Sequence, residues 1–251
     1  MFISEKEQQI LNYLATKNGA ATIKELKNKI FLSEPSIRRY LNSLAEKQLV
    51  LRTHGGAIIN YNSPNAFNDI PIFIRISNMA EEKKKIAMQA SKLLFDGAKI
   101  FLDTSSTSFH ILPYLKNYSD LIVITNNLKT AIAATEINIR TICLGGDVSS
   151  ANISCNSQDT LNMLSKYNAD ILFFSCDALS SDGLLTDKSR EVSYIREQYI
   201  KNAKTKVLMV DNTKLNKKEW YTICSLSDID YCFCDIPLPE NISKMVKTTV
   251  Y

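Results

Sequence analysis

Apolar residues recur at helical spacing near the start of the chain. Ile10, Leu11 and Leu14 fall on one stripe of residues 4–18, and Ser4 with Glu7 three positions later is typical of a capped helix start. A second helix is expected over 22–30, and after a three-residue turn a third begins at Ser33. Their stripes are formed by Ile23, Leu26 and Ile30 and by Ile37, Leu41 and Leu44.

Residues 49–59, LVLRTHGGAII, predict two short strands around Gly55-Gly56. Two helices joined by a short turn and followed by such a hairpin indicate a winged helix-turn-helix, whose second helix enters the major groove of DNA. A three-helix bundle with a solvated surface helix is the alternative, and it leaves the hairpin unexplained.

The pattern changes after residue 59. Residues 60–78 contain two prolines and several asparagines without helical periodicity, so we expect a linker. Beyond them, short apolar runs alternate with helical stretches, which is typical of a mostly parallel sheet covered on both faces. The expected strands are 98–103, 121–125, 139–146, 169–177, 206–211 and 230–235, and the expected helices are 80–95, 109–115, 128–136, 157–167 and 190–203. The predicted fold class is α/β, with a winged helix-turn-helix domain at 1–59, a linker at 60–78 and an α/β domain at 79–251.

Charge is unevenly distributed along the chain. Of the net charge of +4, residues 1–57 supply all, with nine Lys or Arg against five acids, because the remainder holds 21 of each. Such an excess is expected of a segment that meets the phosphate backbone of double-stranded operator DNA. The residues expected to contact DNA, on the third helix opposite its stripe and on the hairpin, are Ser33, Ser36, Arg38, Arg39, Asn42, Arg52, Thr53 and His54.

The remaining composition restricts the class of protein. No run approaches the roughly 18 apolar residues of a membrane span, and the charged start lacks the apolar region of a signal peptide, so we expect a cytoplasmic protein without a membrane partner. The six cysteines form no C-x-x-C pair, and only two histidines are present. Buried thiols are therefore expected, with no metal ion and no cofactor.

Small polar residues follow five of the expected strands. Ligands of open α/β sheets bind beyond the carboxyl ends of the strands, and a hydroxyl-rich loop can hold phosphate through its N–H groups. Caps and turns use the same residue types, but their convergence at one edge favours a polyol or sugar-phosphate pocket. The candidate effector-binding residues are Asp103, Thr104, Ser105, Ser106, Thr107, Thr125, Asn126, Gly145, Gly146, Asp177 and Lys214.

Catalytic arrangements are poorly represented. The sequence contains no evident Ser-His-Asp or Cys-His set and no phosphate-binding glycine motif. Glu191 is the one carboxylate placed to act as an acid–base group, although a helix-surface residue is the simpler interpretation. We therefore expect a protein that is not an enzyme.

Residues 33–57, SEPSIRRYLNSLAEKQLVLRTHGGA, resemble the DNA-binding signature of the DeoR family of bacterial transcriptional regulators. Segments 81–107, 123–131, 143–147, 183–186 and 210–214, and the segment around Glu191, are similar in order and spacing to the sensor domain of that family. The resemblance implies a domain like ribose-5-phosphate isomerase that senses a phosphorylated sugar. It implies a homo-oligomer that represses a sugar uptake or catabolism operon and releases DNA when the sugar phosphate binds. It also implies effector-binding roles for the candidate residues, including Glu191 and Asp211.

Several positions depart from the family pattern. Ser105 replaces a Gly in the phosphate loop, and Ile195, followed by Arg196, replaces a Lys. Asn156 or Ser157 also stands where a Gly is usual, and Tyr40 stands for an Asp. Three hypotheses stay open: a repressor released by a sugar phosphate, a constitutive DNA binder with a degenerate sensor, and a sugar-phosphate isomerase.

Overall fold

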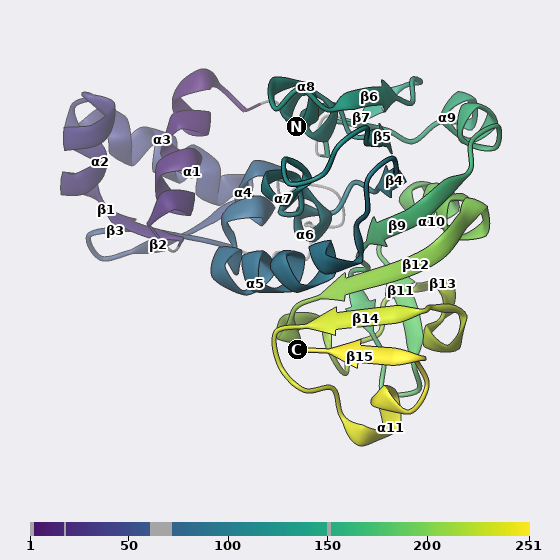
Figure 1. Ribbon diagram of the computed structural model, residues 1–251. Helices are drawn as coiled ribbons and strands as arrows, with labels where there is room; N and C mark the ends of the chain where they lie inside the picture. Colours follow the sequence, from purple (N-terminus) through teal and green to yellow (C-terminus); the bar gives the residue numbers. More distant parts are fainter. Residues whose placement is uncertain (1–2, 18, 61–71, 150–151) are drawn as a thin grey trace. The chain divides into compact units, whose positions relative to one another are not determined.

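Two structural units make up the chain, Met1–Asn78 and Met79–Tyr251. The computed structural model describes residues 3–17, 19–60, 72–149 and 152–251 (Figure 1). No helix among these residues is both long enough and apolar enough to cross a bilayer.

Each predicted helix of the N-terminal unit begins at a capping side chain. α1 (Glu5–Thr16) follows Ser4, α2 (Ile23–Ile30) follows Thr22, and α3 (Glu34–Glu46) follows Ser33. Each cap accepts a hydrogen bond from the N–H three residues on, which satisfies one of the donors that a helix start leaves open. The three predicted apolar stripes are buried in one core, so all three helix predictions are confirmed.

The predicted hairpin also forms. β2 (Val50–Thr53) and β3 (Gly56–Ile59) pair antiparallel, and a short strand that was not predicted, β1 (Ala20–Thr22), adds to β3. The linker prediction is wrong for residues 72–77, which form helix α4 (Ile72–Ser77) because Ile74 is buried in the same core as α1. Residues 61–71 of that linker lie outside the described residues.

A seven-stranded parallel sheet forms the C-terminal unit, in the order β15-β14-β12-β9-β4-β5-β6. All six predicted strands are present, and β15 is an edge strand that was not predicted. The strands are β4 (Lys99–Leu102), β5 (Ile122–Thr125), β6 (Arg140–Cys143), β9 (Ala169–Phe174), β12 (Ala203–Val210), β14 (Tyr231–Cys234) and β15 (Thr248–Val250).

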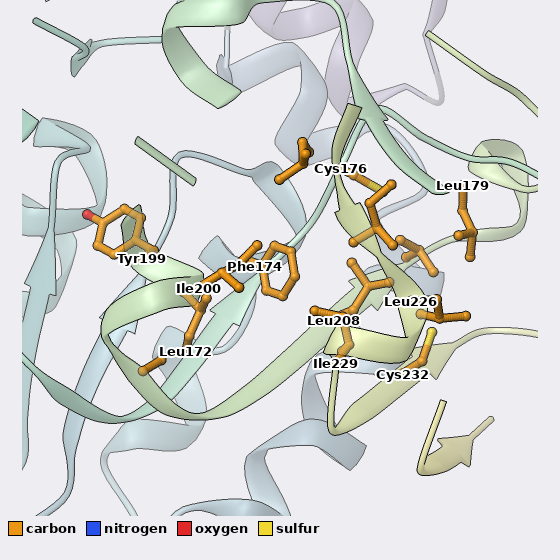
Figure 2. Close-up of a cluster of buried hydrophobic side chains, with 14 of the residues drawn as sticks. Leu172, Phe174, Cys176, Leu179, Tyr199, Ile200, Leu208, Leu226, Ile229 and Cys232 are labelled. Carbon is orange, nitrogen blue, oxygen red and sulfur yellow. The ribbon is translucent and has the colours of Figure 1, made fainter. Parts of the chain in front are cut away.

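Successive residues of the central strands are buried on opposite faces of this sheet. Ile171 and Phe173 of β9 join one core with α5 (Ala80–Ala90), α7 (Leu112–Leu115) and α8 (Leu128–Glu136), whereas Leu172 and Phe174 join the other with α9 (Gln158–Leu164) and α10 (Arg190–Asn202). Figure 2 shows the second core, with Tyr199 at its margin and the tyrosine hydroxyl directed away from the other labelled side chains. Two buried faces explain why the strands read as continuous apolar runs.

Short elements of the C-terminal unit differ from the predictions. Pro113 lies in α7, which is separate from α6 (Ser106–Phe109), and a proline cannot continue a preceding helix, so the single helix expected over 109–115 is two. The polar loop expected after Asp177 contains part of a small antiparallel sheet of β10 (Ala178–Leu179), β11 (Leu184–Asp187) and β13 (Tyr221–Ser225). The hairpin of β7 (Val148–Ser149) with β8 (Ser154–Cys155) and the helix α11 (Glu240–Ser243) complete the unit.

We expect Gly56→Ala to destabilise the N-terminal unit by roughly 1–3 kcal/mol, the usual cost of overpacking. A Cβ at this position would lie 2.1 Å from the Ala21 carbonyl oxygen and 2.8 Å from Thr22 Cα, so β1 would have to move. Gly55→Ala is the matched control, because a Cβ there meets no atom within 4 Å. Urea unfolding followed by circular dichroism measures the effect, while the single tryptophan, Trp220, reports separately on the C-terminal unit. Equal stability of the two variants would contradict the expectation.

Candidate functional site

The outer surface of α3 carries the predicted DNA-contacting side chains. Arg38, Arg39 and Asn42 are exposed, whereas the apolar stripe on the opposite side of the helix is buried. The Ser33 hydroxyl caps the helix, accepting the Ser36 N–H at 3.3 Å and lying 2.9 Å from the Ser36 hydroxyl. The structure therefore places a surface of basic and amide side chains along the middle of a well-capped helix.

Side chains of the hairpin divide into two kinds. Thr53 and His54 are exposed beside the turn, as a contact with the DNA backbone would require. Arg52, also expected to contact DNA, is half-buried and turns one guanidinium nitrogen toward α3. Its Nη1 donates to Asn42 Oδ1 at 3.0 Å and to the Arg38 carbonyl at 3.3 Å.

Glu7 fastens α1 to the end of α3. Its carboxylate accepts hydrogen bonds from Lys47 Nζ and the Ser43 hydroxyl, both at 2.7 Å, and from the Ser4 N–H at 2.8 Å. Although burial alone would raise it, the hydrogen bonds from Lys47, Ser4 and Ser43 lower the pKa of Glu7 to about 2. Ser43 therefore faces α1, since its hydroxyl donates a hydrogen bond to Glu7.

The candidate effector residues lie where the parallel strands end. Asp103 and Thr104 follow β4, Thr125 and Asn126 stand at the end of β5, and Lys214 lies in the short turn after β12. Ser105 to Thr107 begin α6, and Ser105 has an ordinary extended backbone with φ −75°, so a serine is accommodated there without strain. Its hydroxyl accepts the Ser108 N–H at 3.1 Å, which makes it the cap of α6.

Asp103 is the most heavily engaged of these residues. Its Oδ1 accepts from the Ser105 N–H at 3.0 Å and the Ser108 hydroxyl at 2.7 Å. Its Oδ2 accepts from Arg196 Nε at 3.1 Å, Arg196 Nη2 at 2.9 Å and the Ser175 N–H at 3.3 Å. Five donors occupy a carboxylate with about four acceptor positions, so this structure leaves Asp103 little capacity for a ligand hydroxyl.

Arg196, which the sequence did not indicate as a site residue, extends the hydrogen-bond network of Asp103 to β11. Its guanidinium is buried and Nη1 also bonds the Asp187 carboxylate, so it bridges two acids. Asp187 Oδ1 accepts the Asp177 N–H at 2.8 Å. Burial raises the pKa of Asp187 to about 6, although Arg196 opposes the shift.

Asn126 closes the network from the side of β5. It accepts the Tyr199 hydroxyl at 3.1 Å and donates to the Cys155 carbonyl at 2.7 Å. A crevice remains that is too narrow to admit a water molecule. Its lining consists of Asp103, Thr104, Asn126, Val192, Ile195, Arg196 and Tyr199.

The third predicted loop is packed against α9. Gly146 has φ +135°, and a Cβ there would lie 2.3 Å from Ser157 Oγ and 2.4 Å from Thr160 Oγ1. Thr160 Oγ1 donates to the Gly145 carbonyl at 2.8 Å. The missing side chain of Gly146 therefore permits a close approach between loop and helix, whereas a Cβ at Gly145 would meet no atom within 4 Å. Neither glycine lines the crevice.

Two lysines lie at the same sheet edge. Lys214 Nζ donates to the Ser175 hydroxyl and to the Cys176 carbonyl, both at 2.8 Å. Lys83, buried on α5, donates to the Ser106 hydroxyl at 3.2 Å. Its place in the charged run 81–85 is typical of an exposed helix surface and gives no sign of this contact. Both cations counteract burial and hold the pKa of Asp211 below its usual value.

Two further candidates stand apart from the crevice. Glu191 is exposed in the first turn of α10 and accepts the Ser189 hydroxyl at 3.0 Å. Thr107 is fully buried, and its hydroxyl meets no hydrogen-bond partner among the described residues. Among the residues that the structure describes, no group of three or more His, Cys, Asp or Glu side chains is placed to hold a metal ion.

Two family models match this chain. The DeoR-like helix-turn-helix domain matches residues 6–63, and the DeoR C terminal sensor domain matches residues 78–236.

Characterised relatives align over most of the chain. The glycerol-3-phosphate regulon repressor of Escherichia coli is 29% identical over 93% of this chain and 91% of its own length. The L-fucose operon activator of Haemophilus influenzae is 29% identical over 95% and 94%. The lactose phosphotransferase system repressor of Staphylococcus epidermidis is 28% identical over 88% of each. These relatives are named as regulators, not as enzymes.

Among solved structures, ribose 5-phosphate isomerase A of Methanocaldococcus jannaschii aligns with a TM-score of 0.42. It is 22% identical and covers 55% of each chain. A likeness of this size carries no inference about activity.

We expect the Glu7 contacts to stabilise the N-terminal unit above about pH 4.5 and to be lost toward pH 2. The pKa in the folded state, about 2, lies below the ordinary value of 4.5, so folding favours the ionised form, and acid removes that preference. Thermal unfolding of the wild type and Glu7→Gln across this pH range measures it. The two melting temperatures should converge as the pH falls, with Glu5→Gln as the control for losing one first-turn charge. A difference that does not change with pH would contradict the assignment.

We expect Arg196→Met to lower the free energy of unfolding of the C-terminal unit by roughly 3–5 kcal/mol, because it leaves the buried carboxylates of Asp103 and Asp187 without their cationic partner. Urea unfolding followed by Trp220 fluorescence measures it. Glu191→Gln, on the exposed side of the same helix, should stay within about 0.5 kcal/mol of the wild type. An Arg196→Met variant as stable as that control would show that the network is dispensable.

Proposed function

The chain belongs to the DeoR family of transcriptional regulators, and from this premise we propose that it represses a sugar uptake or catabolism operon until a phosphorylated sugar releases it from DNA. The observation that carries the proposal is the exposed surface of Arg38, Arg39 and Asn42 on a helix-turn-helix. Arginine and asparagine are suited to base edges and phosphates in the major groove.

Sensing of a phosphorylated sugar is the second part of the proposal. The relatives named above regulate glycerol-3-phosphate, L-fucose and lactose phosphotransferase genes, which points to small polyols and sugars as the class of signal. Thr104, Asn126 and Lys214 at the sheet edge offer the hydroxyl, amide and ammonium groups that such a ligand uses. Release requires that the ligand bind the DNA-bound and released states with different affinities.

A constitutive DNA binder with a degenerate sensor is the second candidate. The saturated Asp103 carboxylate and the narrow crevice favour it, since a ligand would have to displace Arg196 or widen the space beside it. An isomerase is disfavoured, because Glu191 is exposed and does not line the crevice. We propose that the chain is not an enzyme.

Oligomerisation and location follow from the same proposal. Helix-turn-helix regulators commonly bind two half-sites, so a homo-oligomer would present two copies of α3. We propose that this homo-oligomer acts in the cytoplasm on double-stranded operator DNA, without a cofactor or metal ion.

The test is a fluorescence anisotropy titration of the full chain against its own upstream DNA at fixed salt, repeated with a panel of sugar phosphates. We expect specific binding that one member of the panel reverses. The double variant Arg38→Ala/Arg39→Ala should lose that binding while its circular dichroism is unchanged.

Lys92→Ala/Lys116→Ala is the matched control, because it removes two exposed charges from the C-terminal unit. Undiminished DNA binding by the double arginine variant would refute the proposed surface. Specific binding that no sugar phosphate alters, with no ligand-induced rise in melting temperature, would favour the constitutive binder.

A further inference from the structure

Arg52 and Asn42 form a pair within the proposed DNA-binding surface. Arg52 Nη1 lies 3.0 Å from Asn42 Oδ1 and 3.3 Å from the Arg38 carbonyl oxygen, so one guanidinium nitrogen bridges the side chain and the backbone of α3. Arg52 Nε is buried and meets no acceptor among the described residues. The contacts of Nη1 therefore orient this side chain.

The pair fixes which end of the Asn42 amide faces outward. An arginine side chain has donors and no acceptor, and it keeps its charge at any ordinary pH. The Asn42 atom that meets it must therefore be the oxygen, whichever way the amide is drawn. Within the described part of the chain, Oδ1 is the engaged atom of Asn42, and the exposed NH₂ group is the end that can serve a ligand.

We infer that Arg52 is a positioning residue that makes Asn42 read DNA as a hydrogen-bond donor and so favour guanine over adenine. The inference rests on the proposed binding of DNA by α3. It gives Arg52 a role besides any contact of its other N–H groups with phosphate, because its Nη1 is bonded to α3.

The choice of base follows from the major-groove pattern. Adenine is read by an asparagine that donates to N7 and accepts from N6, and this needs the amide oxygen as well as the nitrogen. The bond from Arg52 takes one of the two lone pairs of Oδ1 and holds the oxygen toward Arg52, so the amide nitrogen is the end that is turned to the groove. Guanine presents two adjacent acceptors, N7 and O6, and therefore matches an NH₂ group better than adenine does.

Selection from a random double-stranded DNA library, using the full chain, tests the inference. Comparison of the wild type with Asn42→Ala locates the base position that Asn42 reads. At that position the wild type should prefer guanine by about fivefold or more, the discrimination of one good contact, and Asn42→Ala should lose the preference. Arg52→Met frees Oδ1 and should shift the preference to adenine.

Two controls separate positioning from charge. The double variant Arg52→Met/Asn42→Ala should show the profile of Asn42→Ala, since Arg52 is proposed to act through Asn42. Lys24→Met removes one positive charge from the exposed surface of α2, outside the proposed DNA-contacting residues, and should leave the base preference unchanged.

Three results overturn the inference. The first is a wild-type preference for adenine at the Asn42 position, which is informative even if Arg52→Met does not fold. The second is an Arg52→Met variant that binds all sequences more weakly with an unchanged preference, because that describes a phosphate contact. The third is a wild type that selects no sequence, which refutes the proposed function itself and is thereby distinguished from the other two.

Discussion

The carboxylate of Asp103 is the interaction on which the carboxyl edge of the parallel sheet depends. It ties the end of β4 to the first turn of α6, to the chain after β9 and, through Arg196, to α10 and β11. Desolvating charged groups is costly, and the cost is recovered only when their remaining donors and acceptors are satisfied. The five donors around Asp103 meet that requirement. Thr104, Asn126 and Tyr199 are positioned around this fixed centre.

Local signals predicted most of the fold. Ser4, Thr22 and Ser33 each begin a helix because a short hydroxyl side chain can accept an N–H that the helix leaves open. The apolar runs became strands with two buried faces. Elements without enough residues to show a period were not predictable, as with the three-residue β1 and the two-residue β10. α4 was hidden in the same way: its six residues follow a segment that reads as irregular, yet Ile72 and Ile74 are buried and Phe73 packs against the N-terminal core.

The candidate site was predictable by position and much less by role. Strand ends and the outer surface of α3 follow from the fold class. Of the predicted effector residues, Asp103, Thr104 and Asn126 line the crevice, whereas Gly145, Gly146 and Glu191 do not. Their partners come from distant segments: Arg196 is 93 positions from Asp103, and Lys83 reaches Ser106 from a helix that precedes the first strand of the sheet. No periodicity or spacing encodes such pairings. This is why the direction of Arg52 toward Asn42, ten positions away on α3, was not predicted.

The guanidinium of Arg196 occupies both acceptors that a ligand hydroxyl would seek, Asp103 and Asp187. Because Arg196 belongs to the same chain as these carboxylates, it competes with a ligand for them at a local concentration that dilution does not reduce. Any ligand that used Asp103 would have to displace Arg196. The ligand concentration that gives a half-maximal response would therefore depend on the strength of the Arg196–Asp103 ion pair as well as on the fit of the ligand. Substitutions far from the ligand, on α10 or β11, could then reset the threshold of the response without changing which molecule triggers it.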